Sequence, residues 1–307
     1  MRGRDHHDLG RRTVSGLAHH LEGWWPAPLR RSDRIHPWPV DAFAGLLDQP
    51  SPLAGGNSAL PPMWHLFSFL EYPAQHELGA DGHPAAGHFL PPIPHRRRMF
   101  AGGRWHYHRP LRVGDEVTLR STVISIEPKI GRSGDLVFVT VRHEYSIGDL
   151  LAGVEEQDIV YRSEPPAAPA APSAPPTEPA EDTTPAEHEL RIDPDPTLLF
   201  RFSALTYNAH RIHYDQPYAT GVEGYPRLVV HGPLLALLAL ELPRRHHPEA
   251  QVLEFHYRLR RPAFTGATIQ ARGWAPAGDG WCGLAVGELG RLPSLTATVR
   301  LRAVEEE

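Results

Sequence analysis

Alternating polar and apolar residues run through two long stretches of the chain, residues 105–128 and 255–278. Such alternation is typical of half-buried β-strands, because successive side chains of a strand point to opposite faces of its sheet. Four further strands are expected downstream, at residues 136–147, 155–162, 281–289 and 295–303. The strands are joined by tight glycine-containing turns, which predicts antiparallel sheets.

The two stretches share their turn residues. Residues 109–114 read RPLRVG and residues 261–266 read RPAFTG, so an Arg-Pro pair precedes a glycine by the same spacing in both. Proline ends a strand and glycine accepts the conformations of a tight turn. The chain is therefore expected to contain two diverged copies of one unit.

The segment between the copies has the composition of a linker. Residues 163–187 are almost entirely Pro, Ala, Glu, Thr and Ser, which favours extended, solvated chain. A length of 307 residues also suggests about two domains. We predict an N-terminal domain over residues 1–162, a linker over 163–187 and a C-terminal domain over 188–307.

One helix is expected ahead of the strands in each half, at residues 61–72 and 231–242. The second is apolar nearly all round, so other elements must enclose it. An antiparallel sheet curled around one buried helix is the hot-dog arrangement. The pattern thus favours an α+β double hot dog, two antiparallel sheets each wrapped around a central helix, over an ordinary α+β sandwich.

Composition narrows the class of partner. The formal net charge of −5 gives no strong attraction to nucleic acid. The longest apolar run, residues 233–242, is too short to span a bilayer, and the N-terminus lacks the apolar core of a secretory signal. The single cysteine, Cys282, excludes an internal disulfide and favours a reducing compartment. We expect a cytoplasmic protein without nucleic-acid or membrane partners.

The 20 histidines raise the question of a metal site. Several occur as adjacent pairs, no HExxH motif is present, and one cysteine cannot build a thiolate zinc site. We expect no metal.

Two segments carry candidate chemistry. Gly232 stands at the expected N-cap of the second helix and Pro233 at its first position. Unpaired N–H groups there could polarise a thioester carbonyl, and such donors typically lower a barrier by about 3–4 kcal/mol. Ordinary helix capping explains the same residues.

The second segment spans residues 207–215. His213 offers an imidazole suited to proton transfer near neutral pH. Asn208 can hold a water or hydroxyl, and Asp215 could orient a histidine or cap a turn. A polar loop without catalytic function is the alternative.

Residues 208–215 (NAHRIHYD) and 228–232 (LVVHG) resemble the MaoC-like, R-specific enoyl-CoA hydratases, which carry D-x-N-P-[IL]-H-x-D followed by I-V-H-G. Over the whole chain the sequence is more similar to the type 2 hydroxyacyl-thioester dehydratases and the 3-methylfumaryl-CoA (mesaconyl-C4-CoA) hydratases. The resemblance implies that His213 is the catalytic histidine, Asp215 the trailing acid and Gly232 the oxyanion-binding glycine.

Three positions depart from the MaoC pattern. Asn208 replaces the catalytic aspartate, His210 the asparagine and Arg211 the proline. An amide does not accept a proton as a carboxylate does, so His213 would be the only strong base and Asn208 would position the water. The implied reaction is reversible addition of water to a 2-enoyl-CoA thioester, without a metal or redox cofactor.

The acyl group stays open at this stage. Substrate contacts are expected from residues of the two segments, namely Tyr207, His210, Arg211, Tyr214, Asp215 and His231. A branched C5 dicarboxylic group, as in 3-methylfumaryl-CoA or itaconyl-CoA, would need a buried cation, and a plain acyl chain an apolar tunnel. A non-catalytic acyl-thioester-binding protein, a subunit of a heteromeric dehydratase and a thioesterase are alternatives, and a homodimer is one expected assembly.

Overall fold

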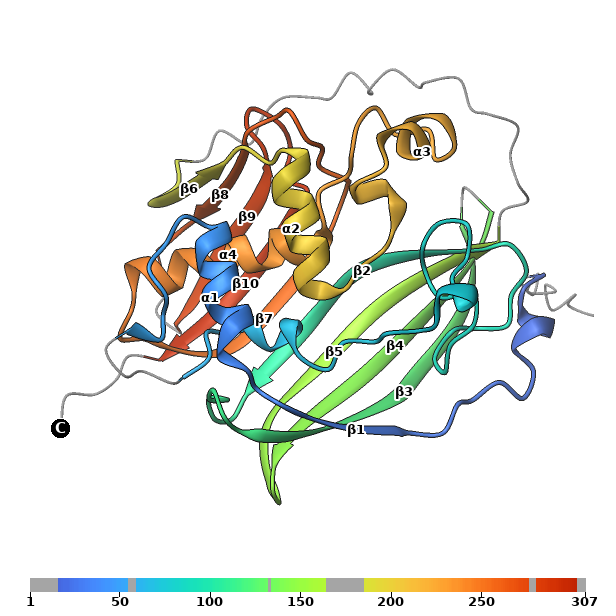
Figure 1. The fold of residues 1–307 in the computed structure, drawn as a ribbon, viewed down its shortest axis with the longest axis horizontal. Coiled ribbons are helices and arrows are strands. Elements are labelled where there is room, and N and C mark those ends of the chain that lie inside the picture. Colours follow the sequence, from blue (N-terminus) through green and yellow to red (C-terminus); the bar gives the residue numbers. More distant parts are fainter. Residues whose placement is uncertain (1–15, 55–58, 132–133, 164–184, 276–279, 303–307) are drawn as a thin grey trace, which may run out of the picture.

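The computed structural model describes residues 16–54, 59–131, 134–163, 185–275 and 280–302. Within these ranges one ten-stranded sheet has the order β1-β3-β4-β5-β2-β7-β10-β9-β8-β6, and its neighbouring strands are antiparallel (Figure 1). The strands are β1 (Leu29–Arg34), β2 (Arg96–Tyr107), β3 (Glu116–Gly131), β4 (Gly134–Ile147), β5 (Leu150–Ser163), β6 (His188–Ile192), β7 (Gln251–Leu259), β8 (Ile269–Gly273), β9 (Trp281–Glu288) and β10 (Leu295–Arg302).

The two halves meet edge to edge in the middle of this sheet. β2 of the first half pairs with β7 of the second, from Gly102 opposite Arg258 to His106 opposite Glu254. The two predicted sheets are therefore joined into one. β1 and β6 add an edge strand at each end, and neither was expected from the sequence.

The helices of the described residues are α1 (Pro37–Leu46), α2 (Pro196–Thr206), α3 (Gln216–Gly221) and α4 (Gly232–His246), with 3-10 turns η1 (Ala18–Leu21), η3 (Trp64–Phe67), η4 (Gln75–Glu77) and η5 (Arg211–His213). α4 is the predicted apolar helix, and residues 234–243 are all buried. It packs on β6, β8, β9 and β10. Its N-cap is His231, one residue before the predicted position. The hot-dog arrangement expected for the C-terminal half is confirmed.

The helix predicted over residues 61–72 is wrong. Only η3 is helical there, because Met63 (φ 65°) and Phe69 (φ 58°) adopt left-handed backbone conformations on either side of it. Trp64 and Phe67 of η3 are buried, so the apolar residues that suggested a helix instead anchor a short turn in the core. α1, which was not predicted from the sequence, packs against α2.

The repeat is visible in the contacts around both turns. Leu60 N–H donates to Leu111 O and Val230 N–H to Ala263 O, each at 2.8 Å. Gly114 (φ 94°) and Gly266 (φ 74°) both have the left-handed conformation expected of the shared turn. The chain therefore enters residues 61–72 at the position from which the other half enters α4.

A cavity of about 1450 Å³ lies beside the strands of the N-terminal half, on the side where that half carries no long helix. In Figure 1 loop segments, rather than a helix, run across the curved strands β2 to β5. Inward side chains of these strands line the cavity, among them Leu119, Val141, Tyr145, Glu155 and Ile159. Residues between Pro73 and Phe100 line it too, and from Arg96 onward this segment belongs to β2.

Most of the predicted linker, residues 164–184, and the N-terminal residues 1–15 lie outside the described residues. The division into residues 1–162, 163–187 and 188–307 therefore stays a prediction. Among the described residues, no helix has the length and apolar character needed to cross a membrane.

Candidate active site

The segment that carries His213 is a tight connection between α2 and α3. α2 ends at Tyr207, whose backbone is left-handed (φ 48°). The side-chain oxygen of Asn208 then accepts a hydrogen bond from the His210 N–H at 2.9 Å, which closes an Asx turn. Asp215 caps α3 by accepting from the Tyr218 N–H at 3.1 Å. Local hydrogen bonds thus fix the backbone on both sides of His213.

His213 is held as a neutral imidazole. Its Nδ1 lies 2.7 Å from the carbonyl oxygen of Val229. A carbonyl can only accept, so Nδ1 carries the proton and Nε2 keeps a free lone pair. Burial lowers the pKa of His213 to about 4, against the opposing effect of the Val229 hydrogen bond and with a further lowering from charge on His83. At neutral pH the ring is therefore in the form that a general base needs.

Two more histidine rings surround His213. His231 stacks on it with ring centroids 3.6 Å apart, and His210 meets it edge-on at 5.5 Å. His231 Nε2 is 2.8 Å from Ser203 Oγ, and no partner is found for its Nδ1 among the described residues. Burial, followed by charge on His213 and His210, lowers the pKa of His231 well below its usual value. The close packing of these three buried rings disfavours a positive charge on any of them.

Gly232 is the first residue of α4, and the first N–H groups of a helix have no intrahelical partner. A Cβ at Gly232 would approach the Leu259 Cδ1 to 2.6 Å. Close packing of the helix start on β7 is therefore one reason for glycine here. The oxyanion role of its N–H remains a prediction.

Arg211 and Asp215 are engaged with protein groups. They form an ion pair at 2.7 Å, and Arg211 also donates to the Ala80 carbonyl at 2.9 Å and lies over the Tyr218 ring. The Arg211 hydrogen bond and the cap on α3 lower the pKa of Asp215. These contacts hold the segment in shape, and a substrate contact from either residue stays a prediction.

The predicted residues fall into two groups around the cavity. Those that line it are Tyr207, Asn208, Tyr214 and His231. His210, Arg211, His213, Asp215 and Gly232 are not among the described residues that line it and form the layer behind. Tyr207 and Tyr214 are 62% and 45% exposed, which places their rings at the open side of the site rather than in the core.

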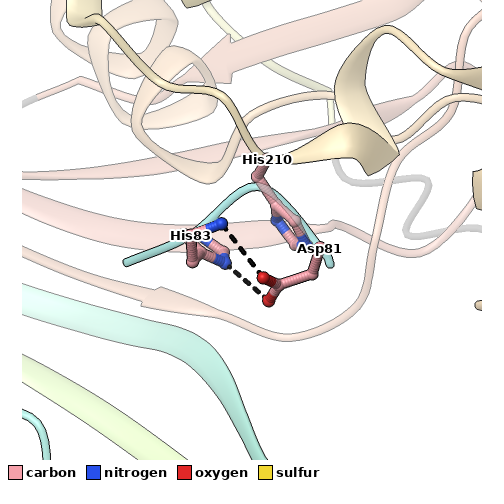
Figure 2. A group of neighbouring side chains, drawn as sticks. All are labelled: Asp81, His83 and His210. Atoms are coloured by element: carbon pink, nitrogen blue, oxygen red, sulfur yellow. Dashed lines mark hydrogen bonds and ion pairs between the residues drawn. The ribbon is translucent and has the colours of Figure 1, made fainter. Parts of the chain in front are cut away.

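Two polar clusters in the cavity wall were not predicted from the sequence. One contains Asp81 and His83, which meet His210 (Figure 2). The other centres on Glu155, which accepts from Tyr145 Oη at 3.3 Å and from Gln157 at 3.0 Å. Glu155 is only 3% exposed. Glu155 could have been noticed in the sequence, because it is a charged residue at a strand position whose side chain points into the protein. No sequence pattern indicates that residues 81–83 lie beside residue 210.

Comparison with known proteins identifies the family. The family model for hydroxyacyl-thioester dehydratase type 2 matches residues 63–265. The mesaconyl-C(4)-CoA hydratase of Chloroflexus aurantiacus is 48% identical over 226 residues, which are 73% of this chain and 78% of that protein. The mitochondrial type 2 hydroxyacyl-thioester dehydratase of Schizosaccharomyces pombe is 28% identical over 238 residues, 69% of this chain and 77% of its own length.

Among solved structures, a Mycobacterium tuberculosis protein described as having a double hot-dog fold superimposes with a TM-score of 0.52 at 18% identity, covering 92% of this chain and 96% of its own. The double hot-dog fold is confirmed. The chain belongs to the type 2 hydroxyacyl-thioester dehydratase family and is a hydro-lyase that acts on acyl thioesters, as the sequence predicted.

Proposed function

We propose that this protein catalyses the reversible hydration of a 2-enoyl-CoA whose acyl group carries a carboxylate, as in mesaconyl-C4-CoA (3-methylfumaryl-CoA). The observation that carries the proposal is the state of His213, a neutral ring with Nε2 free to accept a proton. The 48% identity to the Chloroflexus mesaconyl-C(4)-CoA hydratase supports this acyl group. Itaconyl-CoA, with the same number of acyl carbons, is the related candidate.

The proposed reaction begins with a water molecule between His213 and Asn208. His213 Nε2 takes a proton from the water as its oxygen bonds to the β-carbon. The electron pair of the double bond moves toward the thioester oxygen, which the N–H of Gly232 stabilises at the start of α4. Protonation of the α-carbon completes the addition. Asn208 takes part by orientation alone, since its oxygen already accepts from His210.

The cavity offers cations for the anionic parts of such a substrate. Arg31 and the run Arg96, Arg97 and Arg98 line it. Arg97 pairs with Glu223 at 3.1 Å and Arg31 with Glu71 at 3.0 Å, whereas no ion pair of Arg98 is found in the described part of the chain. Guanidinium groups suit both phosphate and carboxylate. We assign Arg98 to the CoA phosphates.

The test measures hydration of a panel of enoyl-CoA thioesters, with and without a terminal carboxylate. The loss of enoyl-thioester absorbance reports the rate of each reaction. Mesaconyl-C4-CoA or itaconyl-CoA is expected to be hydrated with the highest kcat/KM. Equal or better turnover of unsubstituted enoyl-CoA would contradict the carboxylated substrate. Release of free CoA would instead indicate a thioesterase, and tight binding without turnover a non-catalytic acyl-thioester-binding protein or a subunit that requires a partner.

Two further proposals concern the setting of the protein. The buried, single Cys282 is compatible with a reducing compartment, and we propose that the protein is cytoplasmic. We also propose a homodimer. Fractionation of the native cells and the sedimentation of the purified protein test these proposals separately.

A further inference from the structure

A loop of the N-terminal half, residues 80–83, packs against the segment of the C-terminal half that carries His213. Arg211 N–H donates to the Asp81 carbonyl and the Arg211 side chain to the Ala80 carbonyl, both at 2.9 Å. Gly82 follows these two residues, with φ 89°, and a Cβ there would lie 1.9 Å from the Ala209 carbonyl oxygen. Only glycine allows this approach of two backbones. The loop is therefore placed by specific contacts.

The docked loop carries an Asp–His pair into the cavity wall. One carboxylate oxygen of Asp81 accepts from the His83 N–H at 3.0 Å, and the other lies 3.1 Å from His83 Nδ1 (Figure 2). The pKa of Asp81 falls to about 2, since its bonds to His83 and the charges of His83 and His210 outweigh the raising effect of burial. An ionised carboxylate can only accept, so Nδ1 of His83 carries a proton and Nε2 is left for exchange.

One histidine ring, that of His210, lies between this pair and the proposed base. The His83 ring lies 4.0 Å from the His210 ring, and the His210 ring 5.5 Å from the His213 ring, measured between centroids. Asp81 and His83 line the same cavity as Asn208 and His231. Aspartate has been replaced by Asn208 in the catalytic segment, and this loop returns a carboxylate–histidine pair to the site from the other half.

We propose that His83, oriented by Asp81, is a second acid–base residue of the site and gives the α-carbon of the substrate its proton. The proposal rests on the hydratase function above. In the reactive form His83 carries a proton on each ring nitrogen, the second taken from solvent. His213 Nε2 takes one proton from water, the water oxygen bonds to the β-carbon, and the proton on His83 Nε2 passes to the α-carbon. His213 is then charged and His83 neutral. Proton exchange with solvent, through the part-exposed His83, restores both rings.

The electrostatic arrangement separates the two roles. Charge on His83 is one cause, after burial, of the lowered pKa values of His210 and His213. His210, with a pKa of about 2, stays neutral between them. The titratable groups near His83 include Asp81, His210 and His213; Asp81 also acts to raise the pKa of Arg96 in β2, and charge on Arg98 acts to lower that of His210. Such pairs, whose protonation states are pushed apart, are a common basis for acid and base assignments.

By residue type Asp81, His83 and His210 could also hold a metal ion, because one ligand atom of each lies within 4.8 Å of the others. The observed arrangement fits an acid–base pair better. His83 Nδ1 is used by Asp81, and the His83 and His210 rings lie 4.0 Å apart between centroids with a 38° tilt.

The experiment uses the full-length protein and the enoyl-CoA that it hydrates best. His83→Gln is expected to lower kcat about 100-fold, the lower end for loss of a general acid, with KM within about threefold. Added imidazole should restore part of the rate, because the cavity can admit it. His76→Gln, an exposed histidine of the same loop region, is the matched control and should behave as the wild type.

Two further variants test the positioning of His83. Asp81→Asn replaces one acceptor by a donor, so it should turn His83 to the other tautomer and reduce kcat at least as strongly, as loss of a triad aspartate does. Gly82→Ala should reduce kcat without abolishing folding, because only the docking of the loop is disturbed. A circular-dichroism melt confirms that each variant is folded.

The outcomes are separable. If the wild type hydrates no enoyl-CoA, the proposed function fails. If the wild type is active and His83→Gln retains kcat within threefold of His76→Gln, or is not rescued by imidazole, the role of His83 is wrong. Loss of wild-type activity on chelation, restored by Zn²⁺, would also overturn the pair in favour of a metal site.

Discussion

The two halves of the molecule share one arrangement of strands and turns, and they differ in the element that packs against the strands. In the C-terminal half the chain turns from Val230 into α4, whose residues 234–243 are buried against the strands. In the N-terminal half the equivalent turn after Leu60 leads into η3, and left-handed residues stop it after one turn. The first arrangement gives a packed core, and the second leaves a cavity of about 1450 Å³.

This difference explains how duplication can yield one active site. The packed C-terminal half carries His213 and the start of α4, and we propose that the cavity of the N-terminal half holds the substrate. The polar side chains of the N-terminal half line this cavity instead of facing bulk solvent, so they can act together with residues of the C-terminal half. Residues 61–72 thus form η3 instead of a long helix, and the cavity lies beside the strands of the same half.

The strongest test of the comparison removes the base from the packed half. His213→Ala is expected to reduce kcat at least 1000-fold while the protein stays folded, because no other group of that segment accepts a proton as readily. Steady-state hydration rates and a thermal melt measure the two effects. Activity within tenfold of the wild type would mean that the base is another residue.

Stability should follow the packed half. Leu238 in α4 is 1% exposed, and Leu238→Ala should lower the free energy of unfolding by about 2–5 kcal/mol. Leu66 of η3 lines the cavity and is part-exposed. The matched change Leu66→Ala should cost about 1 kcal/mol or less. Urea unfolding of both variants gives the comparison, and equal losses would show that the open half is as tightly packed.

The dependence of stability on pH should also reflect the packed half. The pKa of His213 is about 4 in the folded protein and near 6.5 when unfolded. Between these two pH values the unfolded chain binds more protons than the folded protein. The contribution of His213 to the free energy of unfolding is therefore complete above pH 6.5 and is lost as the pH falls toward 4. This residue accounts for roughly 3 kcal/mol of that fall. Urea midpoints across this range should therefore decline less for His213→Gln than for the wild type or His76→Gln. Parallel curves would refute the assignment.

The smallest effect is expected at the mouth of the open half. Arg98→Ala should raise KM several-fold, leave kcat unchanged and weaken the dependence of KM on salt, because a phosphate contact binds ground and transition states alike. The exposed Arg120, which pairs with Glu144 at 2.8 Å on β3, provides the control Arg120→Ala. An unchanged KM for Arg98→Ala would place the CoA phosphates elsewhere.

The amino-acid sequence by itself determined most of the strands (though not β1 or β6), the repeat, the buried helix α4 and the segment around His213. Each depends on local pattern, namely alternation in strands, an all-apolar helix, and residues close in sequence. The sequence also gave grounds for the family, through the motifs of residues 208–215 and 228–232.

Only the tertiary structure decided that residues 61–72 form a short turn instead of a helix. It also decided that the two sheets join through β2 and β7, and that Asp81 and His83 lie beside His210. Apolar residues in a short segment are compatible with either a helix or a buried turn, and the backbone conformations of Met63 and Phe69 settle the choice. Contacts between residues more than 120 positions apart follow from the packing of the two halves. His213 was evident from the sequence as a candidate base, whereas its neighbours across the cavity were not.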